Sequence, residues 1–67
     1  MSKVVKVIEV LAQSDKSWED AADKAVKAAS KSIKNIKSIN IVNFNAKVED
    51  DKITKYRINA KISFVVK

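Results

Sequence analysis

A two-residue alternation over residues 52–67 constrains the fold of this chain more than any other feature. Apolar side chains occupy every second position from Tyr56 to Val66, and polar ones fall between them except at Val65. The segment contains no proline or glycine. This period predicts a long β-strand with one buried and one solvated face. A strand of about 14 residues spans roughly 46 Å, which is long for a chain of 67 residues.

Two further segments have the character of strands. Residues 3–12 are rich in β-branched side chains, which favour strands. Residues 39–48 alternate from Val42 to Val48, but Ile39 and Ile41 fall in the opposite phase. A phase change within one strand predicts a β-bulge, or a face that is buried against another copy. Residues 49–52 predict a short hairpin turn, because aspartate suits turn positions.

A helix is predicted between the first two strands, over about residues 18–36. Apolar residues recur every three or four positions from Trp18 to Ile36, which places them on one stripe of a helix. Ser17 is followed three positions later by Asp20. This spacing predicts a capping box, in which Ser17 caps the amide of Asp20 and Asp20 reaches back. Asn35 or Asn40 is a candidate to end the helix, since asparagine tolerates the left-handed conformation.

The predicted helix is too short to cover the predicted sheet. Its length is about 28 Å, against roughly 46 Å for the last strand. We therefore expect the far end of that strand, with Ile62, Phe64 and Val66, to be covered by other copies. A single domain of this size, residues 1–67, is marginal on its own, and the chain has no cysteine for disulfides. The sequence thus predicts an α+β fold in the order β-α-β-β that assembles into an oligomer.

Charge and composition limit the classes of function. The formal net charge of +6 suits an anionic partner, although a solubilising lysine surface is the favoured explanation. Nucleic acid is disfavoured, because Arg57 is the only arginine and the strand aromatics lie in the core phase. The chain has neither cysteine nor histidine, so we expect no enzyme activity. No signal peptide or membrane span is apparent, which predicts a soluble cytoplasmic protein without a membrane partner.

Three motifs give the chain a resemblance to the dodecin family. They are KVIEVLAQS at residues 6–14, SWEDAADKAV at residues 17–26 and YRINAKISF at residues 56–64. The resemblance covers nearly the whole chain and is closest to the calcium-dodecin branch, which shares the S-W-E opening and a similar third strand. It implies a hollow spherical homododecamer, in which each subunit curls a three-stranded antiparallel sheet around its helix.

The resemblance also implies a flavin site, but an altered one. Flavin-binding dodecins stack the flavin ring on a tryptophan at the start of the second strand and hydrogen-bond it from a glutamine on the third. Aligned without gaps, these two positions hold Ser38 and Arg57. Ser38 offers no aromatic platform, and Arg57 donates hydrogen bonds but accepts none, so we expect weak or absent flavin binding. The predicted ligand-binding residues are Ser38, Arg57, Tyr56 and Asn45. Trp18 is predicted to be an anchor in the core or at an interface.

An anion and a calcium ion are the other ligands that the sequence leaves open. A basic, amide-rich patch is expected on the two strands that should pair, and it consists of Arg57, Lys55, Lys61, Lys47 and Asn45. The patch either holds an anionic small molecule or is a hydrated strand face with ordinary ion pairs. Glu49, Asp50 and Asp51 cluster in the predicted turn, where calcium would need further oxygens from other subunits. A solvated hairpin tip is the alternative.

Two hypotheses about function follow from these features. The first is a dodecin-like homododecamer that binds or stores a small molecule and has an altered flavin site. The second is a structural or interaction oligomer without a small ligand, either stabilised by calcium or binding an acidic partner.

Overall fold

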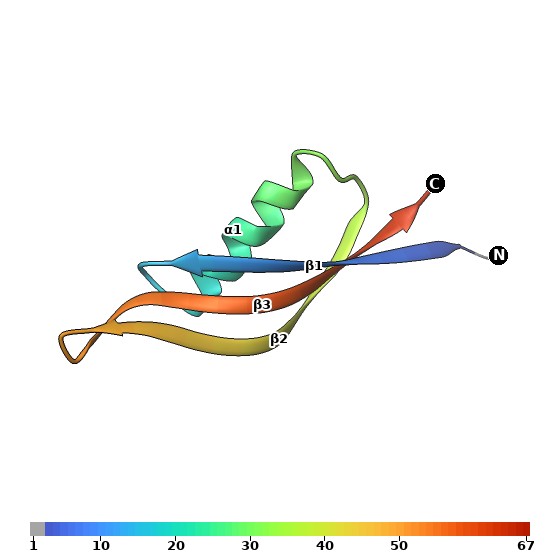
Figure 1. Cartoon of the computed structure of the whole chain (residues 1–67). Helices are drawn as coiled ribbons and strands as arrows, with labels where there is room; N and C mark the ends of the chain where they lie inside the picture. The colour runs from blue at the N-terminus through green and yellow to red at the C-terminus, as the bar shows by residue number, and fades with distance from the viewer. Residues whose placement is uncertain (1–2) are drawn as a thin grey trace.

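The chain forms a three-stranded antiparallel sheet with one helix packed against it (Figure 1). The computed structural model describes residues 3–67. Its elements in chain order are β1 (Val4–Ser14), α1 (Trp18–Ser30), β2 (Ile36–Glu49) and β3 (Lys52–Val66). β3 lies in the centre of the sheet, and β1 and β2 pair with it in antiparallel orientation on either side. The predicted β-α-β-β order and α+β class are confirmed.

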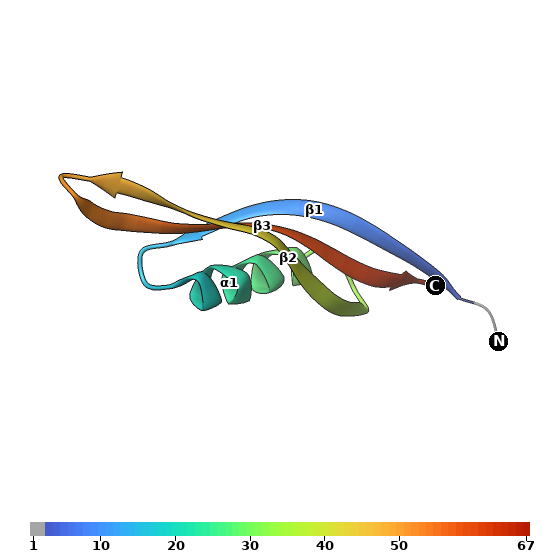
Figure 2. The same cartoon turned by 90° about the horizontal axis from the view of Figure 1, so that it is seen from below.

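The alternation of β3 divides the sheet into a covered and an open face. Ile58, Ala60 and Ile62 lie toward α1 and are at most 1% exposed. Ile58 and Ala60 pack with Ala21 of the helix, which is fully buried. The small alanine side chains on both elements let the helix backbone come close to the sheet. Figure 2 shows α1 against one face of the sheet only, so the residues between these core positions point to the open side.

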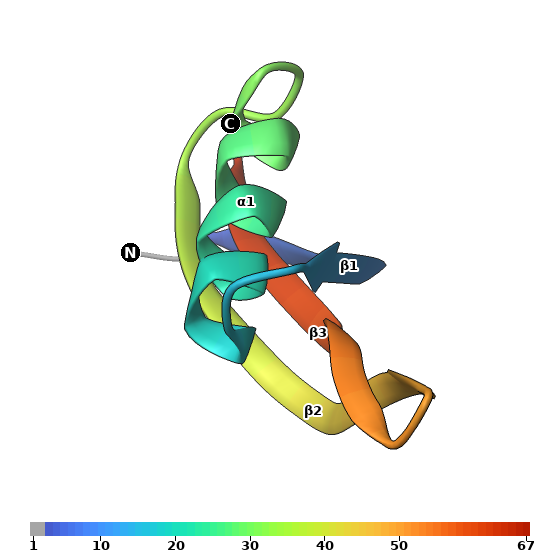
Figure 3. The same cartoon turned by 90° about the vertical axis from the view of Figure 1, so that its left-hand side faces the viewer.

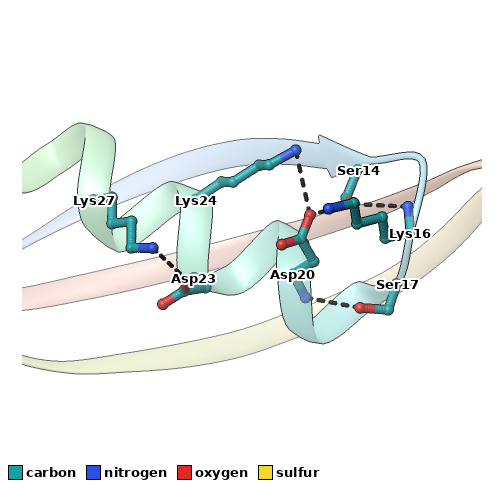
Figure 4. Close-up of polar contacts among 7 residues, drawn as sticks. All are labelled: Ser14, Lys16, Ser17, Asp20, Asp23, Lys24 and Lys27. Atoms are coloured by element: carbon teal, nitrogen blue, oxygen red, sulfur yellow. Dashed lines mark hydrogen bonds and ion pairs between the residues drawn. The ribbon is translucent and has the colours of Figure 1, made fainter.

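Two hydroxyl groups fix the start of α1 (Figure 4). The Ser17 side chain accepts a hydrogen bond from the amide of Asp20 at 2.9 Å, as predicted. The Asp20 carboxylate does not reach back. It accepts instead from Ser14 Oγ at 2.5 Å and pairs with Lys24 Nζ at 3.3 Å. The second half of the predicted capping box is therefore wrong, because Asp20 ties α1 to the end of β1. The bond from Ser14, and then Lys24, lower the pKa of Asp20 below its ordinary value.

α1 ends at Ser30, well before the predicted end near residue 36. Lys31 caps the helix through its own amide. Asn35 then takes a left-handed φ of 65°, and its carbonyl accepts from the amide of Val65 at 3.1 Å. Ile36, predicted to extend the helical stripe, begins β2 because pairing with β3 outweighs a weak local preference. α1 is too short and too polar to cross a membrane, and residues 3–67 contain no other helix.

The predicted phase change in β2 is a β-bulge. Ile39 and Ile41 pair with buried positions of β3, so they face α1. The register then shifts between Ile41 and Asn43, which leaves Val42 as an extra residue. Beyond the shift, Phe44 faces α1 and Asn43 faces the open side. The bulge prediction is confirmed, and β2 extends beyond both ends of the predicted residues 39–48.

The β2–β3 hairpin projects past the start of α1 (Figures 1 and 3). The molecule measures 54 × 20 × 13 Å along its principal axes, so the sheet outruns the helix. The prediction that Ile62 needs another copy to cover it is wrong, because Ile62 is already buried within the chain. Val66 is exposed as expected. Further apolar surface is uncovered on the hairpin, where Phe44 is 58% and Val48 is 61% exposed.

Candidate functional site

The open face of the sheet carries a row of polar side chains that crosses all three strands. Arg57 of β3 lies between Gln13 of β1 and Asn45 of β2. In the next row on the same face, Asn59 lies beside Leu11. Residues directly opposite each other on antiparallel strands have Cβ atoms about 4.5–5.5 Å apart. The sheet register thus brings the guanidinium group into reach of several amides.

These rows line a shallow depression of about 450 Å³. Its lining residues are Leu11, Ala12, Gln13, Asn45, Arg57, Ile58 and Asn59. An arginine offers five donors in a planar fork that matches carboxylates and phosphates, and each amide offers both donors and an acceptor. The depression can therefore hold a small group that is anionic or carries amide-like edges.

No carboxylate forms an ion pair with Arg57 in the described part of the chain. The ion pairs found among residues 3–67 are Lys24–Asp20 at 3.3 Å, Lys27–Asp23 at 3.1 Å and Lys47–Glu49 at 3.1 Å. Arg57 is exposed on the open face. Its guanidinium group is thus available to a carboxylate or phosphate from outside the chain.

One chain does not bring the four predicted ligand-binding residues together. Arg57 and Asn45 are direct neighbours. Ser38 pairs instead with Ser63, and their two hydroxyl groups are hydrogen-bonded. Ser63 is six positions from Arg57 along β3, which is about 20 Å. Tyr56 lies on the opposite face. A site that uses all four residues would therefore need more than one copy of the chain.

Tyr56 belongs to an aromatic cluster built around Trp18. The Trp18 ring meets Tyr56 edge-on with centroids 4.8 Å apart, and Phe44 with centroids 5.9 Å apart. Its Nε1–H donates to the carbonyl of Asn45 at 2.9 Å. Trp18 thus anchors the start of α1 to the β2–β3 hairpin, as predicted. This cluster lies on the helix side, so it provides no stacking platform on the open face.

The three predicted metal-ligating residues form the hairpin turn. Asp50 and Asp51 have φ values of 51° and 64°, as in a two-residue type I′ turn. Glu49 pairs with Lys47 at 3.1 Å. Nowhere in residues 3–67 do three acidic side chains converge in a way that could hold a metal ion. Calcium bound at this turn would therefore need oxygen ligands from other copies.

The sequence analysis missed the contribution of β1 to the depression. It ended the first strand at residue 12, whereas β1 continues to Ser14 and places Gln13 opposite Arg57. Continuing the two-residue period of the first strand past Ala12 would have placed Gln13 in the phase of Leu11. The pairing of β1 with β3 is what makes that placement meaningful, and it connects segments far apart in the sequence.

Comparison with known proteins identifies the family. The family model described as Dodecin matches residues 4–67. The chain belongs to the dodecin family. The calcium dodecin of Mycobacterium tuberculosis, a calcium-chelating antigen whose crystal structure has a novel calcium-binding site, is 35% identical to it. That structure has a TM-score of 0.82, and the match covers 96% of this chain and 91% of the other.

More distant dodecins have the same fold. The dodecin of Streptomyces coelicolor is 20% identical, with a TM-score of 0.93 and coverage of 97% of this chain and 93% of that one. A mutant of the Thermus thermophilus dodecin is 18% identical, with a TM-score of 0.94 and coverage of 98% of both chains. No curated protein sequence matches the chain. The resemblance that the sequence motifs indicated is confirmed.

Proposed function

We propose that this dodecin is a cytoplasmic homododecamer that binds or stores a small molecule and catalyses no reaction. The observation that carries the assembly is the apolar surface that one chain leaves uncovered. Leu11 is 76% and Val7 is 55% exposed on the open face, and Phe44 and Val48 are exposed on the hairpin. Monomeric proteins rarely expose large contiguous apolar patches, and a domain of this size gains stability by self-association.

Native mass spectrometry of the protein purified from cells tests this proposal. We expect a peak of twelve subunits that carries retained small-molecule mass. A monomer at micromolar concentration would refute the assembly. A twelve-subunit peak without any adduct would favour the second hypothesis, an oligomer without a small ligand.

The proposed ligand site is altered from a flavin site. Ser38 forms its hydrogen bond with Ser63 and presents no ring for stacking. Arg57 has only donors to offer a flavin ring. We therefore expect riboflavin fluorescence to remain unquenched at tens of micromolar protein. The double variant Ser38→Trp/Arg57→Gln should gain quenching, and quenching by the wild-type protein would show that the site is not impaired.

An anionic small molecule is the ligand class that we propose for the depression around Arg57. The support for this proposal is the guanidinium group of Arg57. No carboxylate of residues 3–67 forms an ion pair with it, and Gln13 and Asn45 lie on either side of it. The Arg57→Gln variant should lose the retained adduct in native mass spectrometry. Lys52→Gln, which removes one charge from the same strand, should keep it. Equal loss in both variants would mean that general charge, and not Arg57, holds the ligand.

Calcium binding is a second candidate, favoured by the identity of 35% with the calcium dodecin. In this proposal Asp50 and Asp51 supply oxygens at the hairpin turn and other subunits complete the site. EDTA should lower the melting temperature, and calcium should restore it, because a ligand of the folded state stabilises that state by mass action. The Asp50→Asn/Asp51→Asn variant should show no response. An unchanged melting curve of the wild-type protein would exclude this candidate.

A further inference from the structure

Residues 3–6, 31–37 and 64–67, which lie in the half of the molecule opposite the β2–β3 turn, contain six lysines and no acidic residue. We call this set the basic pole. Its six members are Lys3, Lys6, Lys31, Lys34, Lys37 and Lys67. All six are exposed. They come from three separate segments, the start of β1, the α1–β2 connection with the start of β2, and the end of the chain.

The sheet register brings these segments to one end. Val4 pairs with Val66, so that the lysines on their outer sides are neighbours. Phe64 pairs with Lys6 of β1 on one side and with Ile36 of β2 on the other. The hydrogen bond between the Val65 amide and the Asn35 carbonyl, at 3.1 Å, joins the α1–β2 connection to the end of β3. Figures 1 and 2 show these parts in the half of the molecule opposite the β2–β3 turn, with the α1–β2 connection set back from the start of β1 and the end of β3.

The basic pole accounts for the whole net charge of the chain. The chain has 14 basic and 8 acidic residues. Without the six lysines of the pole, eight basic residues remain and balance the eight acidic ones. The ion pairs of the described residues 3–67 all lie outside the pole. The excess positive charge is therefore concentrated in the basic pole and is not spread over the whole surface of the chain.

We propose that the basic pole binds a compact anion that carries several phosphate groups. Lys3 and Lys67 adjoin the paired residues Val4 and Val66, and Lys31, Lys34 and Lys37 follow one another at intervals of three residues. Three residues of chain span at most about 10 Å, close to the Debye length of about 8 Å at physiological ionic strength, so neighbouring lysines can act together on one anion. Mutual repulsion among the lysines disfavours the folded chain, and a bound multivalent anion relieves it.

The residue types of the pole favour recognition by charge density. Lysine is a compact point charge without the planar fork of arginine, and the pole has no arginine. Bases of nucleic acids usually stack on exposed aromatic side chains. Trp18, Phe44 and Tyr56 cluster toward the hairpin, and Phe64 at the pole is only partly exposed. These features favour a small polyphosphate over a nucleic-acid strand.

This proposal is independent of the ligand site proposed at Arg57. Phe64, which pairs with Lys6 of the basic pole, is seven positions from Arg57 along β3, which is about 23 Å. Loss of binding at one site should leave the other unchanged, and the two proposals can fail separately.

Titration calorimetry with inorganic tripolyphosphate tests the proposal on the assembled protein. The test variant is Lys31→Gln/Lys34→Gln/Lys37→Gln. The control, Lys16→Gln/Lys27→Gln/Lys52→Gln, removes the same charge from exposed positions outside the pole. We expect the test variant to bind at least about tenfold more weakly, and its slope of log affinity against log salt concentration to fall by about 2 units. The control should stay within about twofold of the wild-type affinity.

Four outcomes would overturn the proposal. Equally weakened tripolyphosphate binding in both triple variants would show that binding depends on the net charge of the protein and not on the basic pole. Absence of binding by the wild-type protein at low salt, or equal affinity for orthophosphate and tripolyphosphate, would exclude a multivalent site. Tighter binding of a single-stranded oligonucleotide or of vesicles with anionic lipid than of tripolyphosphate would assign the pole to a different partner. Melting curves and native mass spectra of both variants check that folding and assembly are intact.

Discussion

Replacing Trp18 tests how the helix and the hairpin are held together. The Nε1–H···O bond from Trp18 to Asn45, at 2.9 Å, contributes about 0.5–1.5 kcal/mol net. Each of the two edge-on ring contacts, with Tyr56 and Phe44, adds about 0.5–1.5 kcal/mol beyond area burial. Trp18→Leu loses all three interactions and should reduce the free energy of unfolding by about 1.5–4.5 kcal/mol. Trp18→Phe keeps an aromatic ring and loses the hydrogen bond, which costs about 1 kcal/mol.

Guanidinium unfolding followed by circular dichroism measures these differences. All variants must be compared at one protomer concentration, because the apparent stability of an oligomer depends on it. A double-mutant cycle with Tyr56→Leu isolates the ring contact, and the coupling free energy should be about 0.5–1.5 kcal/mol. A cost below about 0.5 kcal/mol for Trp18→Leu, or no coupling to Tyr56, would refute the anchoring role.

Three further changes test individual contacts. Ser17→Ala removes the helix cap and should lower the free energy of unfolding by about 1 kcal/mol, measured by denaturant titration; no change would mean that the cap is not formed in solution. The pKa of Asp20 is lowered from 3.8, so its contribution to stability is present above that pH and is lost as the pH falls through the lower folded value. Melting temperatures below about pH 4 should therefore fall more steeply for the wild-type protein than for Asp20→Asn, and parallel curves would contradict this. Ile62→Ala opens a cavity at a fully buried position and should cost about 2–5 kcal/mol, whereas Ile62→Val should cost about 1 kcal/mol in the same assay.

The order of the elements could be predicted because two of the periods are long and uninterrupted. The alternation of residues 52–67 and the helical stripe after Trp18 are local signals, and local geometry determines both. The helix end could not be predicted in this way. Ile33 and Ile36 both fit the helical stripe, but Ile36 also fits a strand. Only the pairing of β2 with β3 decides between helix and strand at this position. The burial of Ile62 likewise depends on contacts with elements distant in the sequence.

The candidate site was predicted in part. Arg57 and Asn45 lie on adjacent strands joined by a short turn, so their proximity follows from the hairpin alone. Gln13 was missed because β1 and β3 are separated by the helix and a further strand, and their register is not encoded locally. The distance between Ser38 and Arg57 follows from the pairing of Ser38 with Ser63. That pairing includes the bulges of β2, which periodicity detects only approximately.

The extra residue Val42 affects how this chain can be compared with its relatives. Before it, Ile39 and Ile41 face α1 at odd positions, and after it, Phe44 and Ala46 face α1 at even positions. Loss of this one residue in evolution would straighten the strand and shorten it, while both halves would keep their faces. Alignments without gaps between this chain and another dodecin are therefore valid on both sides only if the other chain has the same bulge. Ser38 and Asn45 lie on opposite sides of it, and equivalent residues for these two positions must be assigned from superposed strands, separately for each half of β2.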